Sequence, residues 1–244
     1  MTILVTGGTG VLGRPTVALL EQAGHDVRLL SRTHGDFRGD LTTGDGLESA
    51  FQNVHTVLHL ATSSGAKDRR QTQNAVDAAR AAQVGHFVYI SIVGLEDVPY
   101  PYYGHKLASE DIVEQSGLAF TILRATQFHS FVAKFITMQR RLPFIIAVDA
   151  PVQPIAAEET AQRLLELVDA GPSGRVADIG GPELLQVADV IKRWQAAAGT
   201  HKKVWMLPLA GKTIRAFREG HHMTALPGFG RETFAEYAAR EARK

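Results

Sequence analysis

Short hydrophobic runs alternate with amphipathic segments along the first half of the chain. The runs predict buried strands, and the segments between them predict helices packed on a sheet. The predicted strands cover residues 3–5, 26–30, 56–60, 86–91 and 120–124. The first predicted helix starts near residue 11 and ends at Gly24. The other predicted helices cover residues 46–53, 67–83 and 101–116. Strands that alternate with helices are typical of an α/β fold with a parallel sheet.

The regular alternation loosens after residue 125. Helices are predicted at 157–170, 187–198 and 232–243, and strands at 176–179 and 203–207. Residues 135–148 are mostly apolar with Arg140 and Arg141 between them, and they form either a lid over a pocket or a segment that faces a dimer partner. We expect a dinucleotide-binding core at 1–125 and a mixed substrate lobe with closing elements at 126–244, packed with the core as one unit.

Composition excludes several classes of protein. The chain has no cysteine, which excludes disulfides, thiolate metal sites and a cysteine nucleophile. A net charge of +1 gives no overall attraction to nucleic acid or to a membrane. No apolar stretch reaches the roughly 20 residues that span a bilayer, and the N-terminus enters a strand without the basic region of a signal peptide. We expect a cytoplasmic protein, monomeric or homodimeric.

The glycines that follow the first strand predict a phosphate cradle. The pattern is Gly7-x-x-Gly10-x-x-Gly13, placed between a strand and a helix. Glycine suits a tight turn whose backbone approaches a pyrophosphate, and the helix that follows directs its free N–H groups and positive dipole end at the phosphates. A surface turn produces such spacing by chance, but the flanking strand and helix favour a dinucleotide site.

The end of the second strand bears on cofactor choice. An NAD-specific site carries an acidic residue there, whereas this chain has Ser31 and Arg32. Arg32, and Arg14 directly after the last glycine, can pair with a 2′-phosphate. The alternative is that both arginines are solvated surface residues. The missing carboxylate favours NADP(H).

Small residues follow the strand at 56–60. Ala61, Thr62 and Ser63 allow the backbone to lie against a flat ring at the carboxyl edge of the sheet, where open α/β folds bind ligands. His59 within the strand is expected to be a packing residue.

The helix predicted from Pro101 carries a candidate catalytic pair. Tyr102 and Lys106 are four residues apart and share one helix face. A carbonyl reductase needs this pair, since the ammonium lowers the pKa of the phenol and holds the nicotinamide ribose while the tyrosine exchanges a proton. Ser91, at the end of the preceding strand, is placed to hydrogen-bond the substrate oxygen. Tyr103 has no lysine at the matching offset and is expected to pack.

Polar and aromatic residues follow the strand at 120–124. Gln127, Phe128 and His129 leave the carboxyl edge of the sheet and are candidates for the substrate side, with packing as an equal alternative. His221 and His222 have few carboxylates at ligand spacing, so we expect a surface loop and no metal site.

Several of these motifs together carry a family resemblance. Residues 6–13, Gly39-Asp40-Leu41, residues 89–94 and Tyr102-x-x-x-Lys106 resemble the atypical short-chain dehydrogenases/reductases, and within that group the NmrA-like NAD(P)H-binding branch. Residues 123–128 and 178–182 are also similar to that branch. The resemblance implies a Rossmann doubly wound parallel sheet, a small C-terminal substrate lobe and NADP(H). It places Gly7, Gly10, Gly13, Arg32, Asp40 and Lys106 at the cofactor. Further candidates for cofactor contacts are their neighbours Thr9, Val11, Leu12 and Leu41.

The family resemblance also implies an activity, namely hydride transfer between NADP(H) and a carbonyl, enone or quinone of a small molecule, with Tyr102 as the acid. Some members of the branch lack the tyrosine and act as redox-sensing regulators. This chain keeps it, which favours an enzyme. The alternatives are an epimerase or dehydratase of the same fold that retains its nucleotide, and a non-catalytic NADP(H) sensor.

Overall fold

The computed structural model describes residues 1–242, and these residues form two compact units. Unit 1 consists of Met1–Ser91, Tyr100–Arg124 and Thr160–Ala177. Unit 2 consists of Ile92–Pro99, Ala125–Glu159 and the described residues from Asp178 onward. Part of the predicted C-terminal lobe, Thr160–Ala177, therefore belongs to unit 1. The last two residues of that lobe, and the end of the helix predicted at 232–243, lie outside the described residues.

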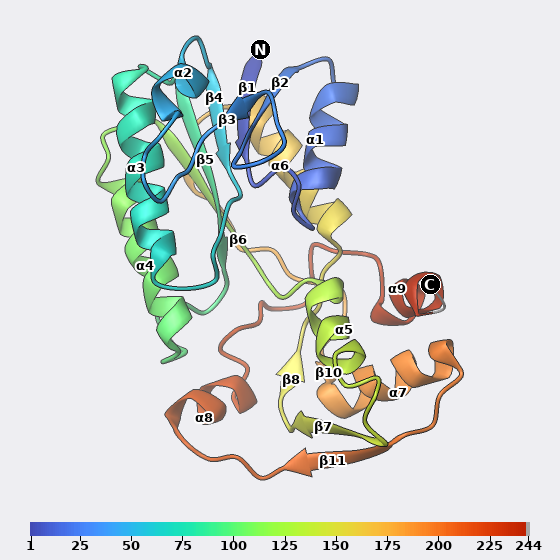
Figure 1. Ribbon diagram of the computed structural model, residues 1–244. Coiled ribbons are helices and arrows are strands. Elements are labelled where there is room, and N and C mark those ends of the chain that lie inside the picture. The colour runs from blue at the N-terminus through green and yellow to red at the C-terminus, as the bar shows by residue number, and fades with distance from the viewer. Residues whose placement is uncertain (243–244) are drawn as a thin grey trace. The chain divides into compact units, whose positions relative to one another are not determined.

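The sheet of unit 1 is a seven-stranded parallel sheet, flanked by helices (Figure 1). The strand order is β3-β2-β1-β4-β5-β6-β9. The chain proceeds outward from β1 to β3 on one side of the sheet and then outward from β4 to β9 on the other, as in a doubly wound Rossmann fold. The expected fold class is confirmed. The strands are β1 (Thr2–Thr6), β2 (Asp26–Ser31), β3 (Phe37–Arg38), β4 (Thr56–His59), β5 (His86–Ile92), β6 (Phe120–Ala125) and β9 (Gly174–Arg175).

Helices cover both faces of this sheet. Figure 1 shows α3 (Lys67–Ala81) and α4 (Pro101–Glu114) side by side on one face, and α1 (Gly13–Gln22) and most of α6 (Ala157–Ala170) on the other. The short α2 (Leu47–Phe51) contacts α3. A cluster of buried residues in this unit joins the central strands to α2, α3 and α4, with Phe51 and Phe87 fully buried. This packing holds α2, α3 and α4 against the sheet, with α4 contributing Ile112 and Val113 near its end.

Unit 2 contains two small sheets and four helices. β7 (Phe144–Val148) pairs in parallel with β11 (Lys203–Leu207), and β8 (Pro151–Val152) pairs antiparallel with β10 (Leu185–Gln186). Its helices are α5 (His129–Thr137), α7 (Val187–Ala198), α8 (Lys212–Arg218) and α9 (Phe234–Glu241). The core of this unit joins α5, α7 and α9 around Trp194 and Phe234.

Most element boundaries agree with the sequence predictions, and the differences have local causes. The helix expected to reach residue 83 ends at Ala81, because Gln83 takes the left-handed conformation (φ +54°) ahead of Gly85. The strand expected at 176–179 lies two residues earlier, at Gly174–Arg175, where it pairs with β6. Among the helices of residues 1–242, none combines the length and the hydrophobicity that crossing a bilayer requires.

Candidate functional site

The glycine turn lies between β1 and α1. Gly7 has a φ of +73°, and a Cβ on it would come within 2.7 Å of the Ala61 amide nitrogen at the end of β4. Its carbonyl accepts a 3.0 Å hydrogen bond from the Gly10 amide, which closes the turn. A Cβ on Gly13 would overlap the backbone of Gly7 and Gly8. Both positions therefore require glycine for close backbone approach.

The start of α1 fits a phosphate group. The N-cap residue is Leu12, whose side chain makes no capping hydrogen bond, so the first amides of the helix have no side-chain acceptor. Thr9, Gly10 and Val11 are exposed beside it. Arg14 Nε donates 3.0 Å to the Thr9 carbonyl, which holds this cation against the turn. The Arg14 amide donates 3.1 Å to the Gly10 carbonyl and Pro15 has no N–H, so the Gly13 amide and the fixed Arg14 side chain are the groups at this helix start that suit a dinucleotide phosphate.

The end of β2 carries the groups expected to select the cofactor. Arg32 is exposed, and Ser31 is half-buried beside it. Asp40 accepts a 2.7 Å hydrogen bond from the Thr42 amide. That bond, with smaller contributions from Arg32 and Lys67, holds the pKa of Asp40 below its ordinary value. Asp40 is thus a turn-bracing carboxylate within the field of Arg32, and the buried Leu41 follows it.

The residues that follow β4 are organised by Asp68 in the first turn of α3. This carboxylate is 3% exposed. It accepts hydrogen bonds from the Thr62 hydroxyl (2.5 Å), the Ser63 amide (2.6 Å) and the Ser63 hydroxyl (2.5 Å). Ala61 bonds back to β1 through its amide and the Thr6 hydroxyl, 3.3 Å apart. The segment 61–63 is therefore held rigidly at the carboxyl edge of the sheet.

Tyr102 lies in the first turn of α4 and points toward this segment. Its hydroxyl is 3.2 Å from Thr62 Oγ1, so a chain of hydrogen bonds runs from the phenol through Thr62 to Asp68. Burial raises the pKa of Tyr102, although the Lys106 ammonium acts in the opposite direction. Lys106 lowers the pKa of the phenol, as expected, but the cost of burying the phenolate is larger, so the net shift is upward. Tyr102 is protonated at neutral pH.

Lys106 is 4% exposed and makes two hydrogen bonds to β5. Its ammonium donates 2.6 Å to the Tyr89 hydroxyl and 2.8 Å to the Ile90 carbonyl, and it lies 4.1 Å from the centroid of the Tyr89 ring. Burial opposes its charge, but the phenols of Tyr89 and Tyr102, with a smaller contribution from Asp68, raise the pKa of Lys106 above its ordinary value. The lysine therefore stays charged inside the fold.

Ser91 lies two residues after Tyr89 on β5, on the same face of the strand. It is 4% exposed, and its hydroxyl oxygen has no hydrogen-bond partner among residues 1–242. Buried polar atoms are nearly always paired, so an orphan hydroxyl in this position marks a place for a ligand or a water.

His59 is a packing residue, as expected from the sequence. Its ring stacks on Tyr89 with centroids 5.7 Å apart, and its nitrogens contact the Thr6 hydroxyl (2.8 Å) and the Thr72 hydroxyl (3.3 Å). Burial, assisted by the Lys106 charge, lowers the pKa of His59 to about 3. The neutral His59 imidazole therefore packs against the Tyr89 ring.

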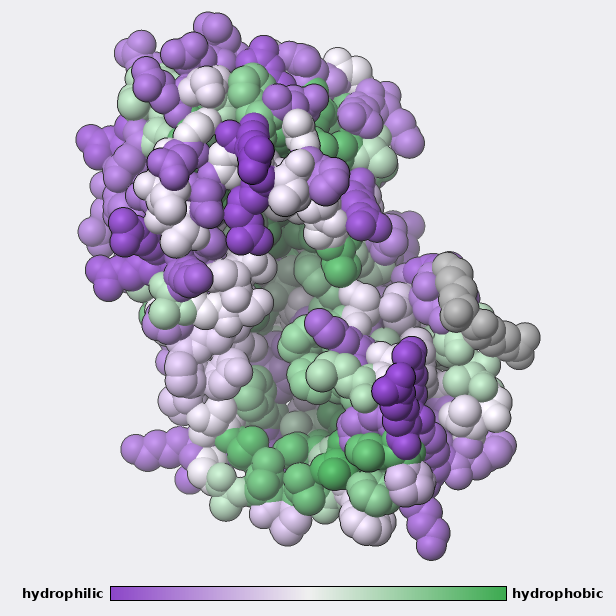
Figure 2. All heavy atoms as spheres, in the orientation of Figure 1, coloured by the Kyte–Doolittle hydropathy of each residue, from purple (hydrophilic) through white to green (hydrophobic). Residues whose placement is uncertain are grey.

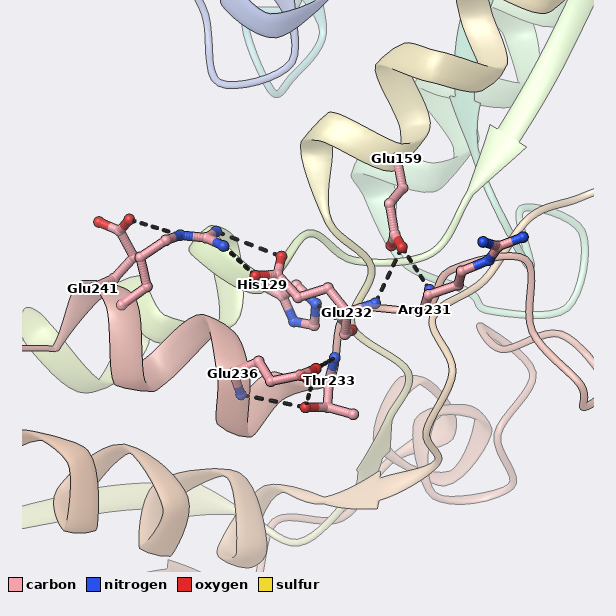
Figure 3. A network of polar contacts seen from close by, with 8 residues as sticks. His129, Glu159, Arg231, Glu232, Thr233, Glu236 and Glu241 are labelled. Carbon is pink, nitrogen blue, oxygen red and sulfur yellow. Dashed lines mark hydrogen bonds and ion pairs between the residues drawn. The ribbon is translucent and has the colours of Figure 1, made fainter.

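The three substrate candidates belong to unit 2. Gln127 donates 3.2 Å to the His222 carbonyl while its buried Oε1 has no partner among residues 1–242, and Phe128 is the N-cap of α5. His129 is buried, stacks on Tyr237 with centroids 5.1 Å apart, and bonds the Glu232 carbonyl at 3.1 Å. Figure 3 shows this histidine within the polar network before α9. The geometry of His129 supports packing, and that of Gln127 leaves one polar atom for a ligand.

The histidine pair after α8 differs from the expectation. His221 is exposed, but His222 is 2% exposed, bonds the Pro151 carbonyl at 3.1 Å and packs edge-on against Phe217. The surface-loop prediction is thus wrong for His222, because the segment after α8 folds back into unit 2. No cluster of three or more His, Cys, Asp or Glu residues in the described part of the chain is arranged to hold a metal ion.

Two residues of this site were missed from the sequence. Asp68 had a signal, since an acidic residue in the first turn of a helix that follows Thr62 and Ser63 is well placed to cap their backbone. Tyr89 also had one, because it shares the strand face of Ser91. All predicted cofactor and catalytic residues lie in unit 1, together with these two.

Known proteins resemble this chain. A profile of the NAD(P)H-binding family matches residues 7–130. Photosystem II assembly factor Ycf39 of Cyanophora paradoxa is 25% identical over 240 residues, covering 86% of this chain and 73% of the relative. Divinyl chlorophyllide a 8-vinyl-reductase of Oryza sativa subsp. indica is 26% identical over 220 residues, covering 74% of this chain and 54% of the relative.

Among solved structures, an NADPH-dependent quinone oxidoreductase of Escherichia coli complexed with NADPH superposes with a TM-score of 0.81 at 17% identity, covering 98% of this chain and 99% of that one. At this identity the structural likeness shows the fold alone.

Proposed function

This chain belongs to the NAD(P)H-binding family as an NmrA-like atypical short-chain dehydrogenase/reductase, and we propose that it is an NADP(H)-dependent oxidoreductase. Its substrate class would be a carbonyl, enone or quinone of a small organic molecule. The observation that carries the proposal is a set of contacts at one edge of the sheet: Gly7 lies against Ala61, and Tyr102 contacts Thr62 in the same segment. Lys106 bonds to the Ile90 carbonyl, next to the unpaired Ser91.

The cofactor is proposed to lie along the carboxyl edge of the sheet in unit 1. The amides at the start of α1 would hold the pyrophosphate. Arg32 and Arg14 would hold the 2′-phosphate, since β2 ends in Ser31 and Arg32 where an NAD-specific site carries an acidic residue. The carboxylate of Asp36, further along, accepts a 2.8 Å hydrogen bond from the Leu29 amide. The rigid segment Ala61–Ser63 would support the nicotinamide side, and Lys106 would donate to the ribose.

NADPH supplies a hydride when bound, and the residues of this chain supply the rest. The half-buried, protonated Tyr102 would donate its proton to the substrate oxygen as that oxygen gains negative charge. The Lys106 ammonium would stabilise the tyrosinate that remains, and Thr62 would hold the phenol in line. Solvent then returns a proton to Tyr102. The unpaired Ser91 hydroxyl would orient the substrate oxygen.

Two other functions remain candidates for this fold. The relative named an assembly factor favours a non-catalytic nucleotide-binding role as the second. A sensor needs the glycine turn but not the proton donor. An epimerase or dehydratase would keep its nucleotide through purification and consume no NADPH overall.

The test is a screen of quinones, enones and ketones with NADPH, on the native chain and on Tyr102→Phe. We expect turnover to fall by about 10²- to 10⁴-fold without loss of NADPH affinity, because the phenol acts only in proton transfer. Tyr103→Phe is the matched control, since it removes a hydroxyl one residue along the same helix. Equal turnover of Tyr102→Phe and native protein would overturn the role of Tyr102, and NADPH binding without turnover of any substrate would favour the sensor.

A further inference from the structure

Two segments of unit 2 have an unusual composition. Residues 129–148 and 199–218 contain eight of the 26 Lys and Arg residues and none of the 25 Asp and Glu residues. A uniform distribution would place about four acidic residues there. The same segments hold eight of the fourteen large hydrophobic residues exposed in residues 1–242: Phe131, Phe135, Met138, Leu142, Trp205, Met206, Leu207 and Leu209.

The two segments lie together in the fold. β7 from the first pairs in parallel with β11 from the second, and Phe144 stacks on Trp205 with ring centroids 4.1 Å apart. Lys202 Nζ donates 2.5 Å to the Arg140 carbonyl and 2.7 Å to the Leu142 carbonyl. Figure 2 shows a band of hydrophobic residues over β7 and β11, with strongly hydrophilic residues beside it over the α5–β7 connection. We call this surface the basic apolar face.

Helix α5 contributes to the face with one of its two sides. Val132, Ala133 and Ile136 are buried in the core of unit 2. Phe131 and Phe135 are more than half exposed and pack edge-on, with centroids 5.0 Å apart, and Met138 at the end of the helix is 72% exposed. The exposed apolar side is thus additional to the side that the fold needs.

Most cations of the face have no acidic partner. Arg215 pairs with Glu219, while Lys202 and Arg218 donate to backbone carbonyls. The side chains of five others make no hydrogen bond or ion pair with any residue in the range 1–242: Lys134, Arg140, Arg141, Lys203 and Lys212. The face therefore presents uncompensated positive charge around exposed aromatic and aliphatic groups.

We propose that the basic apolar face binds the surface of an anionic lipid bilayer. Exposed Trp, Phe, Met and Leu side chains enter the interface, while Lys and Arg remain at the level of the headgroups. A second copy of this chain fits poorly, because a twofold dimer through this face would set the five unpaired cations of each copy against those of the other. The overall charge of +1 gave no indication of a membrane, since acids elsewhere in the chain cancel this local excess.

The first test is co-sedimentation of the full chain with phosphatidylcholine vesicles that contain roughly 30–40% phosphatidylglycerol. Vesicles of phosphatidylcholine alone are the comparison. We expect binding to the anionic vesicles that weakens with salt, and little binding to the neutral ones. Arg140→Glu/Arg141→Glu should lower the affinity at least tenfold. Arg69→Glu/Arg70→Glu is the matched control, because this exposed pair on α3 changes the net charge equally in unit 1.

The second test follows Trp205 itself. The chain has two tryptophans, and Trp194 is buried at 9% while Trp205 is 54% exposed. In Trp194→Phe, the emission of the remaining Trp205 should shift to shorter wavelength when anionic vesicles are added, because the ring leaves water. Met138→Ser should reduce vesicle binding without charge change, and Leu184→Ser, another exposed apolar residue of unit 2, should not.

Three outcomes would overturn the proposal. Equal binding of anionic and neutral vesicles would remove the role of the cations. Equal loss in the two double arginine variants would assign the effect to net charge. Absence of binding to anionic vesicles would refute the proposal, and a concentration-dependent dimer that Met138→Ser disrupts would then assign the face to a second copy.

Discussion

The Lys106 ammonium donates a 2.6 Å hydrogen bond to the Tyr89 hydroxyl while the same ammonium lies 4.1 Å from the centroid of the Tyr89 ring. A second donor of this ammonium reaches the Ile90 carbonyl at 2.8 Å. An ammonium has three donors, so one is left for a ligand. Tyr89 and Ile90 therefore fix both the position of the charge and the direction in which it can act on a bound ribose or on Tyr102.

Tyr89→Phe should weaken catalysis through Lys106. The ring and its packing remain, but the ammonium loses an acceptor, and the pKa of Lys106 falls because Tyr89 contributes to raising it. We expect turnover to fall about tenfold, the value of one hydrogen bond of roughly 1.5 kcal/mol to a charged group. The high-pH limb of the turnover profile should move to lower pH.

Tyr103→Phe serves as the control for this variant, and it should leave the profile in place. If Tyr89→Phe lowered stability but moved neither turnover nor the pH profile, Tyr89 would be a packing residue only.

Arg32→Ala should change the choice of cofactor. We expect the Kd for NADPH to rise at least tenfold, since a charge-assisted hydrogen bond to the 2′-phosphate is lost, and the Kd for NADH to stay within about twofold. Calorimetry with both nucleotides measures this. Arg38→Ala, another exposed arginine in the same region, is the control. An equal loss for both nucleotides in Arg32→Ala would refute the 2′-phosphate assignment.

The fold of unit 1 was predictable because its signals are local. The strand at residues 3–5, the glycine spacing and the alternating helices each depend on neighbours in sequence. Pro101 and Gly199 likewise mark a helix start and a helix end, and the structure has them there. The pairing of β7 with β11 lacked such a signal, because it joins segments about 60 residues apart.

The polar partners of the site could be predicted only in part. The offset between Tyr102 and Lys106 is a property of one helix, so it was visible in the sequence. The contacts of Lys106 with Tyr89 and of Thr62 with Tyr102 depend on how α4 packs on β5 and on the loop after β4. The sign of the pKa shift of Tyr102 depends on burial, which residue spacing does not give.

The ion pair between Glu110 and Arg124 should be required for stability. Arg124 on β6 reaches the carboxylate with Nε at 2.8 Å and a terminal nitrogen at 2.6 Å, and both side chains are at most 3% exposed. Glu110→Ala leaves a buried guanidinium without its carboxylate and should cost about 3–5 kcal/mol in urea unfolding. Glu166→Ala, which removes the exposed ion pair with Arg163, should cost less than about 1 kcal/mol. Equal costs would mean that water reaches Arg124.

Buried neutral histidines should make the protein less stable as the pH falls. Burial lowers the pKa of His129 to about 4, of His86 to about 4 and of His59 to about 3, against an ordinary value of 6.5. Below pH 6.5 the unfolded chain therefore binds protons that the folded chain does not. The contribution of these histidines to the free energy of unfolding is fully present above pH 6.5. It falls toward pH 4 by about 1.4 kcal/mol per pH unit for each such histidine.

Urea unfolding between pH 7 and pH 5 measures this slope in a range where the carboxylates contribute little. His129→Gln should reduce the slope of the free energy of unfolding against pH by the contribution of one histidine proton. His201→Gln, at an exposed histidine, should leave this slope unchanged. An unchanged slope in His129→Gln would mean that the imidazole accepts a proton in the folded state. In that case the charged ring would have to keep its stacking on Tyr237 and its bond to Glu232. It would also need an acceptor for the proton on Nδ1, and this atom has no partner among residues 1–242.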